Sequence, residues 1–158
     1  MYIQLLYMKE LENILSSTSK ISDSKAAVIS IFYVNNAIKE SILNDLKPFD
    51  LSIEQFNVLR ILRGQKGKPL NLQDIQERMI NKMSNTTRLV DKLIKKSFVK
   101  RNVCKENRRK VEIAITDLGL KTLKNLDDQI IETEKKITSS LNNDELKQLN
   151  TLLLKINN

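Results

Sequence analysis

Residues 82–116 read KMSNTTRLVDKLIKKSFVKRNVCKENRRKVEIAIT and combine a helical pattern with two strand-like runs. From Lys82 to Lys110, eleven Lys or Arg stand against two acidic residues, a net charge of +9. The whole chain carries +8, which leaves −1 for all the other residues. A basic surface confined to one segment is typical of a protein that binds a polyanion, and nucleic acid is the leading candidate.

The first part of this stretch predicts a helix over residues 84–96 with two different faces. One face holds six polar or basic residues: Ser84, Asn85, Arg88, Lys92, Lys95 and Lys96. The other holds Thr86, Leu89, Val90, Leu93 and Ile94. Hydroxyl, amide and guanidinium groups at the N-terminal end can reach base edges, and the lysines beyond them suit phosphates. The alternative is a basic face that is only solvated.

The second part of the stretch predicts a β-hairpin. Residues 98–103 and 111–115 read as strands, and in the second strand Val111, Ile113 and Ile115 alternate with less apolar residues, which is the period of a half-buried ribbon. Residues 105–109 form the polar connection. Its basic residues, together with Lys110, place positive charge beside the basic helix, and this coincidence favours nucleic-acid binding over a solvated face.

Helices are expected on both sides of this segment, at residues 24–46, 52–63, 72–79, 116–140 and 141–156. Ser52 with Gln55, and Asn142 with Glu145, have the spacing of reciprocal N-terminal caps. In residues 118–141 the apolar positions recur like those of a coiled coil, at Leu123, Leu126, Ile130, Ile137 and Leu141. We therefore predict a mainly α protein, a winged helix-turn-helix with a small β-hairpin wing and with N- and C-terminal dimerisation helices.

Composition excludes several classes of function. The 158 residues suit one domain spanning 1–158, with residues 50–115 as the winged helix-turn-helix and residues 25–47 and 116–157 as dimerisation helices. The chain has no His and a single Cys, so the usual catalytic triads, zinc sites and intramolecular disulfides are unavailable. We expect no catalytic activity, no metal and no cofactor. Neither a convincing signal peptide nor a long apolar span is present, so we expect a cytoplasmic protein, whose translation starts at Met1 or Met8.

Several short motifs resemble the MarR family of bacterial winged-helix transcriptional regulators. They are the run TTRLVDKL at residues 86–93, the tip ENRR at residues 106–109, Ile115-Thr116 and Leu118-Gly119. The resemblance covers about residues 25–156. It implies a homodimer that binds double-stranded DNA, with interlocked terminal helices and one recognition helix per chain in the major groove.

The resemblance also implies which residues contact DNA. By the resemblance, Ser84, Asn85, Thr87 and Arg88 contact bases or phosphates. The basic helix face and the polar connection of the hairpin complete the predicted DNA-contacting set with Lys92, Lys95, Lys105, Asn107, Arg108, Arg109 and Lys110. Arg109 would enter the minor groove. Three departures from the family pattern stand out. Asn107 replaces an Asp that would orient Arg109, Ser97 replaces the Gly that ends the helix, and the usual Ser/Thr cap aligns near Lys82, which leaves the helix start open by a residue or two.

The function expected from these observations is a ligand-responsive repressor that binds an inverted-repeat operator as a homodimer. The alternative is an RNA-binding or architectural winged-helix module without a palindromic site. A small aromatic or amphipathic effector is a candidate ligand, and Phe32, Tyr33, Phe49 and Phe56 are candidates to line its pocket, although apolar aromatic residues at helical spacing are more often core residues. Cys104 is either a redox sensor or an ordinary cysteine of the wing.

Overall fold

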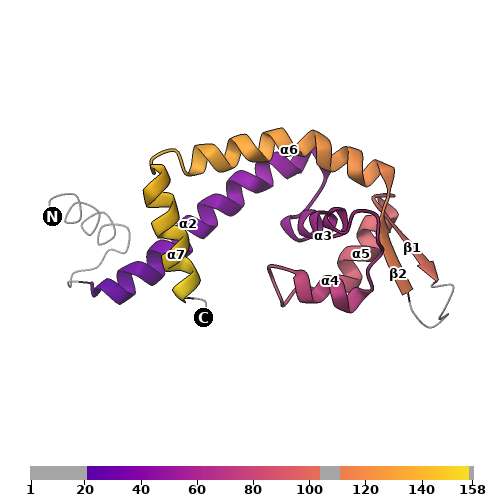
Figure 1. Ribbon diagram of the computed structural model, residues 1–158, viewed down its shortest axis with the longest axis horizontal. Coiled ribbons are helices and arrows are strands. Elements are labelled where there is room, and N and C mark those ends of the chain that lie inside the picture. The colour runs from indigo at the N-terminus through magenta and orange to yellow at the C-terminus, as the bar shows by residue number, and fades with distance from the viewer. Residues whose placement is uncertain (1–20, 104–110, 157–158) are drawn as a thin grey trace. The chain divides into compact units, whose positions relative to one another are not determined.

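The computed structural model describes residues 21–103 and 111–156, and these residues are mainly helical with one β-hairpin. The elements are α2 (Asp23–Leu46), the 3-10 helix η1 (Lys47–Phe49), α3 (Ile53–Gly64), α4 (Leu72–Arg78), α5 (Thr86–Lys95), β1 (Val99–Val103), β2 (Val111–Ile115), α6 (Asp117–Ile137) and α7 (Asn143–Ile156) (Figure 1). This order confirms the predicted fold class. Contacts divide the chain into two compact units, residues 1–41 and 42–158.

The first unit is described through α2. Its first turn is anchored at Ser22, whose side chain accepts the N–H of Lys25 at 3.4 Å. Most large apolar residues of α2 are exposed, among them Phe32 at 65% and Tyr33 at 60%. The helix ends as predicted just before Pro48, which has no N–H to continue the ladder of hydrogen bonds.

Side-chain caps define the starts of α3 and α4. The Ser52 hydroxyl accepts the Gln55 N–H at 3.2 Å, and the Gln55 side chain accepts the Ser52 N–H at 3.0 Å. Asn71 and Asp74 form the same reciprocal pair, at 2.8 and 3.4 Å. Each pair satisfies backbone donors that the first helical turn leaves free. Both starts confirm the sequence prediction.

The core of the second unit joins α3, α4, α5, the hairpin and α6. Its most deeply buried side chains come from all of these elements: Val58, Leu59, Leu62, Ile75, Val90, Leu93, Ile113, Leu123 and Leu126. In the antiparallel hairpin, the register runs from Val99 opposite Ile115 to Val103 opposite Val111. Ile113 also exchanges two backbone hydrogen bonds with Leu70, at 2.7 and 3.0 Å, which fastens the hairpin to the segment before α4.

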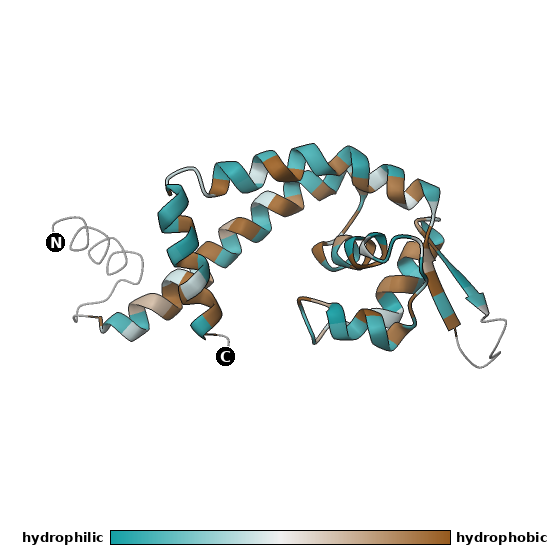
Figure 2. Cartoon of the chain, viewed as in Figure 1, coloured by the Kyte–Doolittle hydropathy of each residue, from teal (hydrophilic) through white to brown (hydrophobic). Residues whose placement is uncertain are grey.

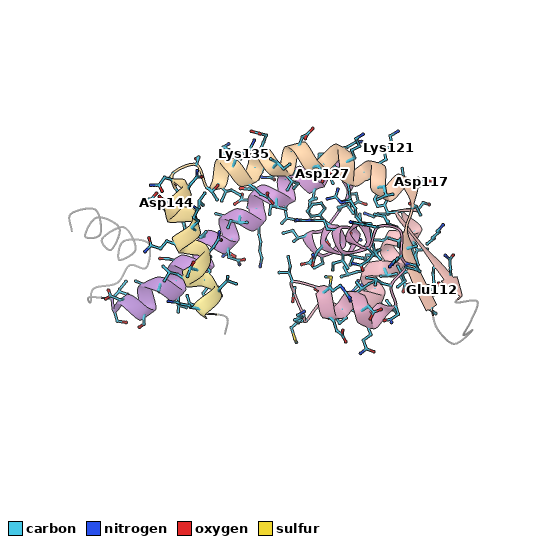
Figure 3. All side chains as sticks on the ribbon, in the orientation of Figure 1. Glu112, Asp117, Lys121, Asp127, Lys135 and Asp144 are labelled. Carbon is cyan, nitrogen blue, oxygen red and sulfur yellow. The ribbon has the colours of Figure 1, made fainter. Side chains whose placement is uncertain are left out.

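The seam of α6 is used differently from the sequence prediction. Leu123, Leu126 and Ile130, expected to form a coiled-coil seam, are buried in the core of their own chain. A heptad-like spacing records which side of a helix is buried but not which chain buries it. Polar contacts complete the packing of α6: Asp127, midway along the helix (Figure 3), accepts two hydrogen bonds from Arg63 of α3, both at 2.8 Å.

Helix α7 has the predicted cap but contributes nothing to the core. Asn142 accepts the N–H of Glu145 at 3.0 Å, and Glu145 accepts the N–H of Asn142 at 2.8 Å. Five of its large apolar residues are exposed by 40% or more, namely Leu149, Leu152, Leu153, Leu154 and Ile156, and Leu146 is half-buried. Apolar residues recur along both α2 and α7 (Figure 2). Within the ranges that the structure describes, no helix is long and apolar enough to cross a membrane.

The start of α6 leaves no room for a side chain at Gly119. A Cβ there would lie 2.3 Å from the Phe98 carbonyl oxygen, a backbone atom that cannot move freely. Gly119→Ala should therefore destabilise the protein by about 1–3 kcal/mol or more, as overpacking does. Gly64→Ala is the matched control, because a Cβ at Gly64 meets nothing within 4 Å. It should be neutral or stabilise by up to about 1 kcal/mol. Urea unfolding of both variants provides the measurement, and equal stabilities would contradict the packing described here.

Candidate nucleic-acid interface

Burial of one face fixes the orientation of α5. Val90 and Leu93 are fully buried and Thr86 is 5% exposed, all in the core of the second unit. Positions three and four residues apart lie on one side of a helix, so this burial turns the opposite side to solvent. That side carries Thr87, Arg88, Lys92 and Lys95, and all four are exposed. The structure therefore places four of the predicted DNA-contacting residues on one free face.

The helix begins two residues later than the sequence analysis predicted. It starts at Thr86, and Asn85 is its N-cap: the Asn85 side-chain oxygen accepts the Arg88 N–H at 3.0 Å. Asn is among the most favoured N-cap residues, and Asn85 therefore caps the helix instead of lying within it as predicted. The Ser84 hydroxyl is buried and has no hydrogen-bond partner in the described structure. Ser84 and Asn85 thus belong to the turn before α5 rather than to its outward face.

Gln76 of α4 holds this turn, a role that the sequence analysis missed. Its side-chain oxygen accepts a hydrogen bond from the Thr86 hydroxyl, and its amide nitrogen donates to the Lys82 carbonyl at 2.6 Å. One side chain therefore joins the last turn of α4 to both sides of the α4–α5 turn. No local sequence pattern marks such a contact, because its partners lie six and ten residues away.

The C-terminal end of α5 shows how Ser97 ends the helix in place of the usual Gly. Ser97 adopts the left-handed conformation, with φ of 60°. Its N–H donates to the Ile94 carbonyl at 2.8 Å, and the Phe98 N–H donates to the Leu93 carbonyl at 3.0 Å. This pair of bonds is the Schellman arrangement, which normally uses Gly at that position. The Thr116 hydroxyl also donates to the Ser97 carbonyl at 2.7 Å, so the start of α6 supports the bend.

Ion pairs remove some cations from the surface and leave others free. Lys96 lies 2.7 Å from an Asp50 carboxylate oxygen, and its hydrogen bond and charge lower the pKa of Asp50. Arg101 of β1 pairs with Asp91 of α5 at 2.9 Å. In the described part of the chain, no ion pair involves Arg88, Lys92 or Lys95. These three charges remain available to a polyanion.

The other predicted residues fall into two groups. Lys105, Asn107, Arg108, Arg109 and Lys110, together with Cys104, lie outside the described residues. Of the four aromatic residues considered for an effector pocket, Phe56 is 7% exposed in the core and Phe49 packs against that core. These two are therefore core residues. Phe32 and Tyr33 are exposed on α2.

Comparisons with known proteins show that the chain is similar to MarR-family and other HTH-type transcriptional regulators. A model of the MarR family matches residues 51–111. The chain is 39% identical over 77 residues to the uncharacterized HTH-type transcriptional regulator YfiV of Bacillus subtilis, a match that spans 49% of this chain and only 47% of that relative. It is 30% identical to the HTH-type transcriptional regulator TcaR of Staphylococcus aureus, over 77% of this chain and 81% of TcaR.

A solved structure extends the likeness over most of the chain. The crystal structure of a MarR transcription factor from Planctomyces limnophilus is similar to this chain with a TM-score of 0.66 and 32% sequence identity. The alignment covers 84% of this chain and 96% of that one. The likeness therefore includes helices on both sides of the region that the family model matches.

The Gln76 contacts predict a measurable effect on stability. Gln76→Ala should remove the acceptor of a buried Thr86 hydroxyl and a donor to the Lys82 carbonyl, and losses of this kind cost about 1–3 kcal/mol. Gln73→Ala is the matched control on the same helix, because the exposed Gln73 side chain has Glu77, four residues on, as its only hydrogen-bond partner among the described residues. It should cost a few tenths of a kcal/mol. Equal midpoints of urea unfolding for the two variants would show that Gln76 does not hold the turn.

Proposed function

This chain belongs to the MarR family, and we propose that it is a transcriptional regulator that binds double-stranded DNA as a homodimer at an inverted-repeat operator. The observation that carries the proposal is the outward face of α5, which bears three basic side chains without an ion pair to any described residue, while its other face is packed in the core. A helix presented in this way can enter the major groove and make both base and phosphate contacts.

Position along α5 divides the work among its residues. Arg88 lies in the first turn of α5 and is exposed, so its guanidinium can pair with guanine through two hydrogen bonds. Thr87 beside it offers a hydroxyl. Lys92 and Lys95, one and two turns further along, suit the phosphate backbone, where they contribute affinity without reading sequence.

The homodimer rests on exposed apolar surface in the terminal helices. On α2 the exposed large apolar residues are Val28, Ile31, Phe32, Tyr33, Val34 and Leu43, and α7 adds five more. Exposed apolar clusters of this kind mark protein–protein contacts. The seam of α6 no longer supports the dimer, because its first half is buried within one chain. Sedimentation at micromolar concentration should show a dimer, and a chain truncated after Leu141 should be monomeric.

Dyad symmetry sets the form of the operator. Two recognition helices related by a dyad can read one face of DNA when their separation matches one helical turn, about 34 Å. Half-site centres about 10 base pairs apart follow from this spacing. A dimer bound over a promoter would block it, so repression is the expected outcome. Release by a small aromatic or amphipathic effector belongs to the same proposal, with exposed Phe32 and Tyr33 as the surface to examine first.

A comparison of three nucleic acids tests the proposal against its alternative. The duplex DNA upstream of the protein's own gene, duplex RNA of the same sequence and random duplex DNA should be titrated in the same salt. We expect the upstream DNA to bind at least about a thousandfold more tightly than random DNA, as specific regulators do. Five base pairs inserted between the half-sites should abolish dimer binding. Equal affinity for all three nucleic acids would instead favour an RNA-binding or architectural module.

Single substitutions on α5 should separate base reading from phosphate binding. Arg88→Ala should cost about 1–3 kcal/mol on the operator and relax the preference at one base pair. Lys92→Ala should weaken operator and random DNA alike and reduce the slope of log affinity against log salt by about one. Lys124→Ala, an exposed lysine on α6, is the control and should change neither. The division of roles is wrong if Arg88→Ala and Lys92→Ala lose the same affinity on both DNAs.

A further inference from the structure

The turn between α4 and α5 exposes two large apolar side chains. Met83 is 93% exposed and Ile80 is 84% exposed, the highest values among the large hydrophobic residues of the described chain. The other exposed large hydrophobic residues lie on α2, α6 and α7. Leaving such side chains in water is unfavourable by roughly 25 cal/mol for each Å² of apolar surface. A partner that covers these two side chains would therefore gain apolar burial.

The backbone that carries these side chains is held in place. The Ile80 N–H donates to the Asn57 side chain of α3 at 3.0 Å, and the Met83 N–H donates to the Asn81 side chain at 3.1 Å. Gln76 bonds to the Lys82 carbonyl between them. A binding partner would thus meet two apolar groups on a backbone that is already ordered, which lowers the entropy lost on binding.

Neighbouring charges indicate what the occupant is. Met83 lies two residues before Asn85, the N-cap of α5, and so stands at the same end of the helix as Thr87 and Arg88. Exposed Lys82 directly precedes Met83 in the chain, and its ammonium group donates a hydrogen bond to the Glu77 carbonyl. The occupant must therefore offer an apolar group within an anionic surrounding. In the major groove of DNA, thymine presents a C5 methyl group that apolar side chains contact, close to the phosphates.

We propose that Met83, with Ile80 three residues before it in the chain, reads the C5 methyl groups of thymines at the edge of each operator half-site. This inference rests on the proposed function and adds a specificity determinant to it, because Arg88 and Thr87 read hydrogen-bonding groups whereas this pair reads a methyl group. Ile80 and Met83 then lose their contact with water only on a site that has thymine at the matching position.

Deoxyuridine provides the test, because it differs from thymidine only by the missing methyl group. Each thymine of the selected operator is replaced in turn, and affinity is measured by fluorescence anisotropy. For the wild-type protein we expect an affinity about fourfold lower when one or two particular thymines of each half-site are replaced, which is the effect expected for the burial of one methyl or methylene group. Met83→Ser should bind the thymidine and deoxyuridine operators equally at that position, while Met83→Leu should keep the loss. Ile80→Ser receives the same measurement.

Each alternative outcome overturns the inference in a recognisable way. The inference is wrong if no deoxyuridine weakens wild-type binding, or if every loss persists in both Met83→Ser and Ile80→Ser. A change from dimer to monomer in Met83→Ser, measured by sedimentation, would show a subunit contact instead. If the wild type prefers no DNA over random sequence, the proposed function is wrong as well. This failure is seen when the operator is selected, before any deoxyuridine is introduced, so the two failures can be told apart. Thermal unfolding should show that both serine variants fold like the wild type.

Discussion

The burial of Val90 and Leu93 is the constraint on which the functional surface depends. Each buried side chain of this size stabilises the fold by about 1.5–3 kcal/mol, whereas exposed ion pairs contribute about 0–1 kcal/mol. Core packing therefore decides how α5 is rotated, and its charges follow. Because those two residues are buried, Arg88 and Lys92, on the opposite side of the helix, face the solvent. The proposed DNA-binding face is the consequence of an apolar contact on the opposite face.

Contacts at its two ends complete the positioning of α5. At the N-terminal end, Asn85 caps the helix and Gln76 holds the turn before it. At the C-terminal end, the left-handed Ser97 is bonded to Thr116 of α6. Such support limits both sliding and tilting of the helix, and binding geometry needs residues held to within about half an ångström. The same turn that Gln76 holds presents Ile80 and Met83, so stability and the proposed base reading share one local structure.

Much of the fold could be predicted because its signals are local. The Ser52–Gln55 pair and the strand alternation around Ile113 each depend on residues close in sequence. The start of α5 could not be predicted, because Ser84 and Asn85 are both good caps and a contact from Gln76 favours the second. The ion pair of Lys96 with Asp50 could not be predicted either, because the two residues are 46 positions apart in the sequence. Periodicity in α6 identified a buried side but assigned it to the dimer, whereas it lies in the chain's own core.

Lysine footprinting tests the central claim, that the outward face of α5 is the surface that meets DNA. The protein is acetylated with and without its operator duplex, and the modified lysines are quantified by mass spectrometry. Lys92 and Lys95 should lose most of their reactivity when DNA is bound, while Lys124 and Lys135 of α6 react as before. Unchanged reactivity of Lys92 and Lys95 in a fully bound sample would contradict the account.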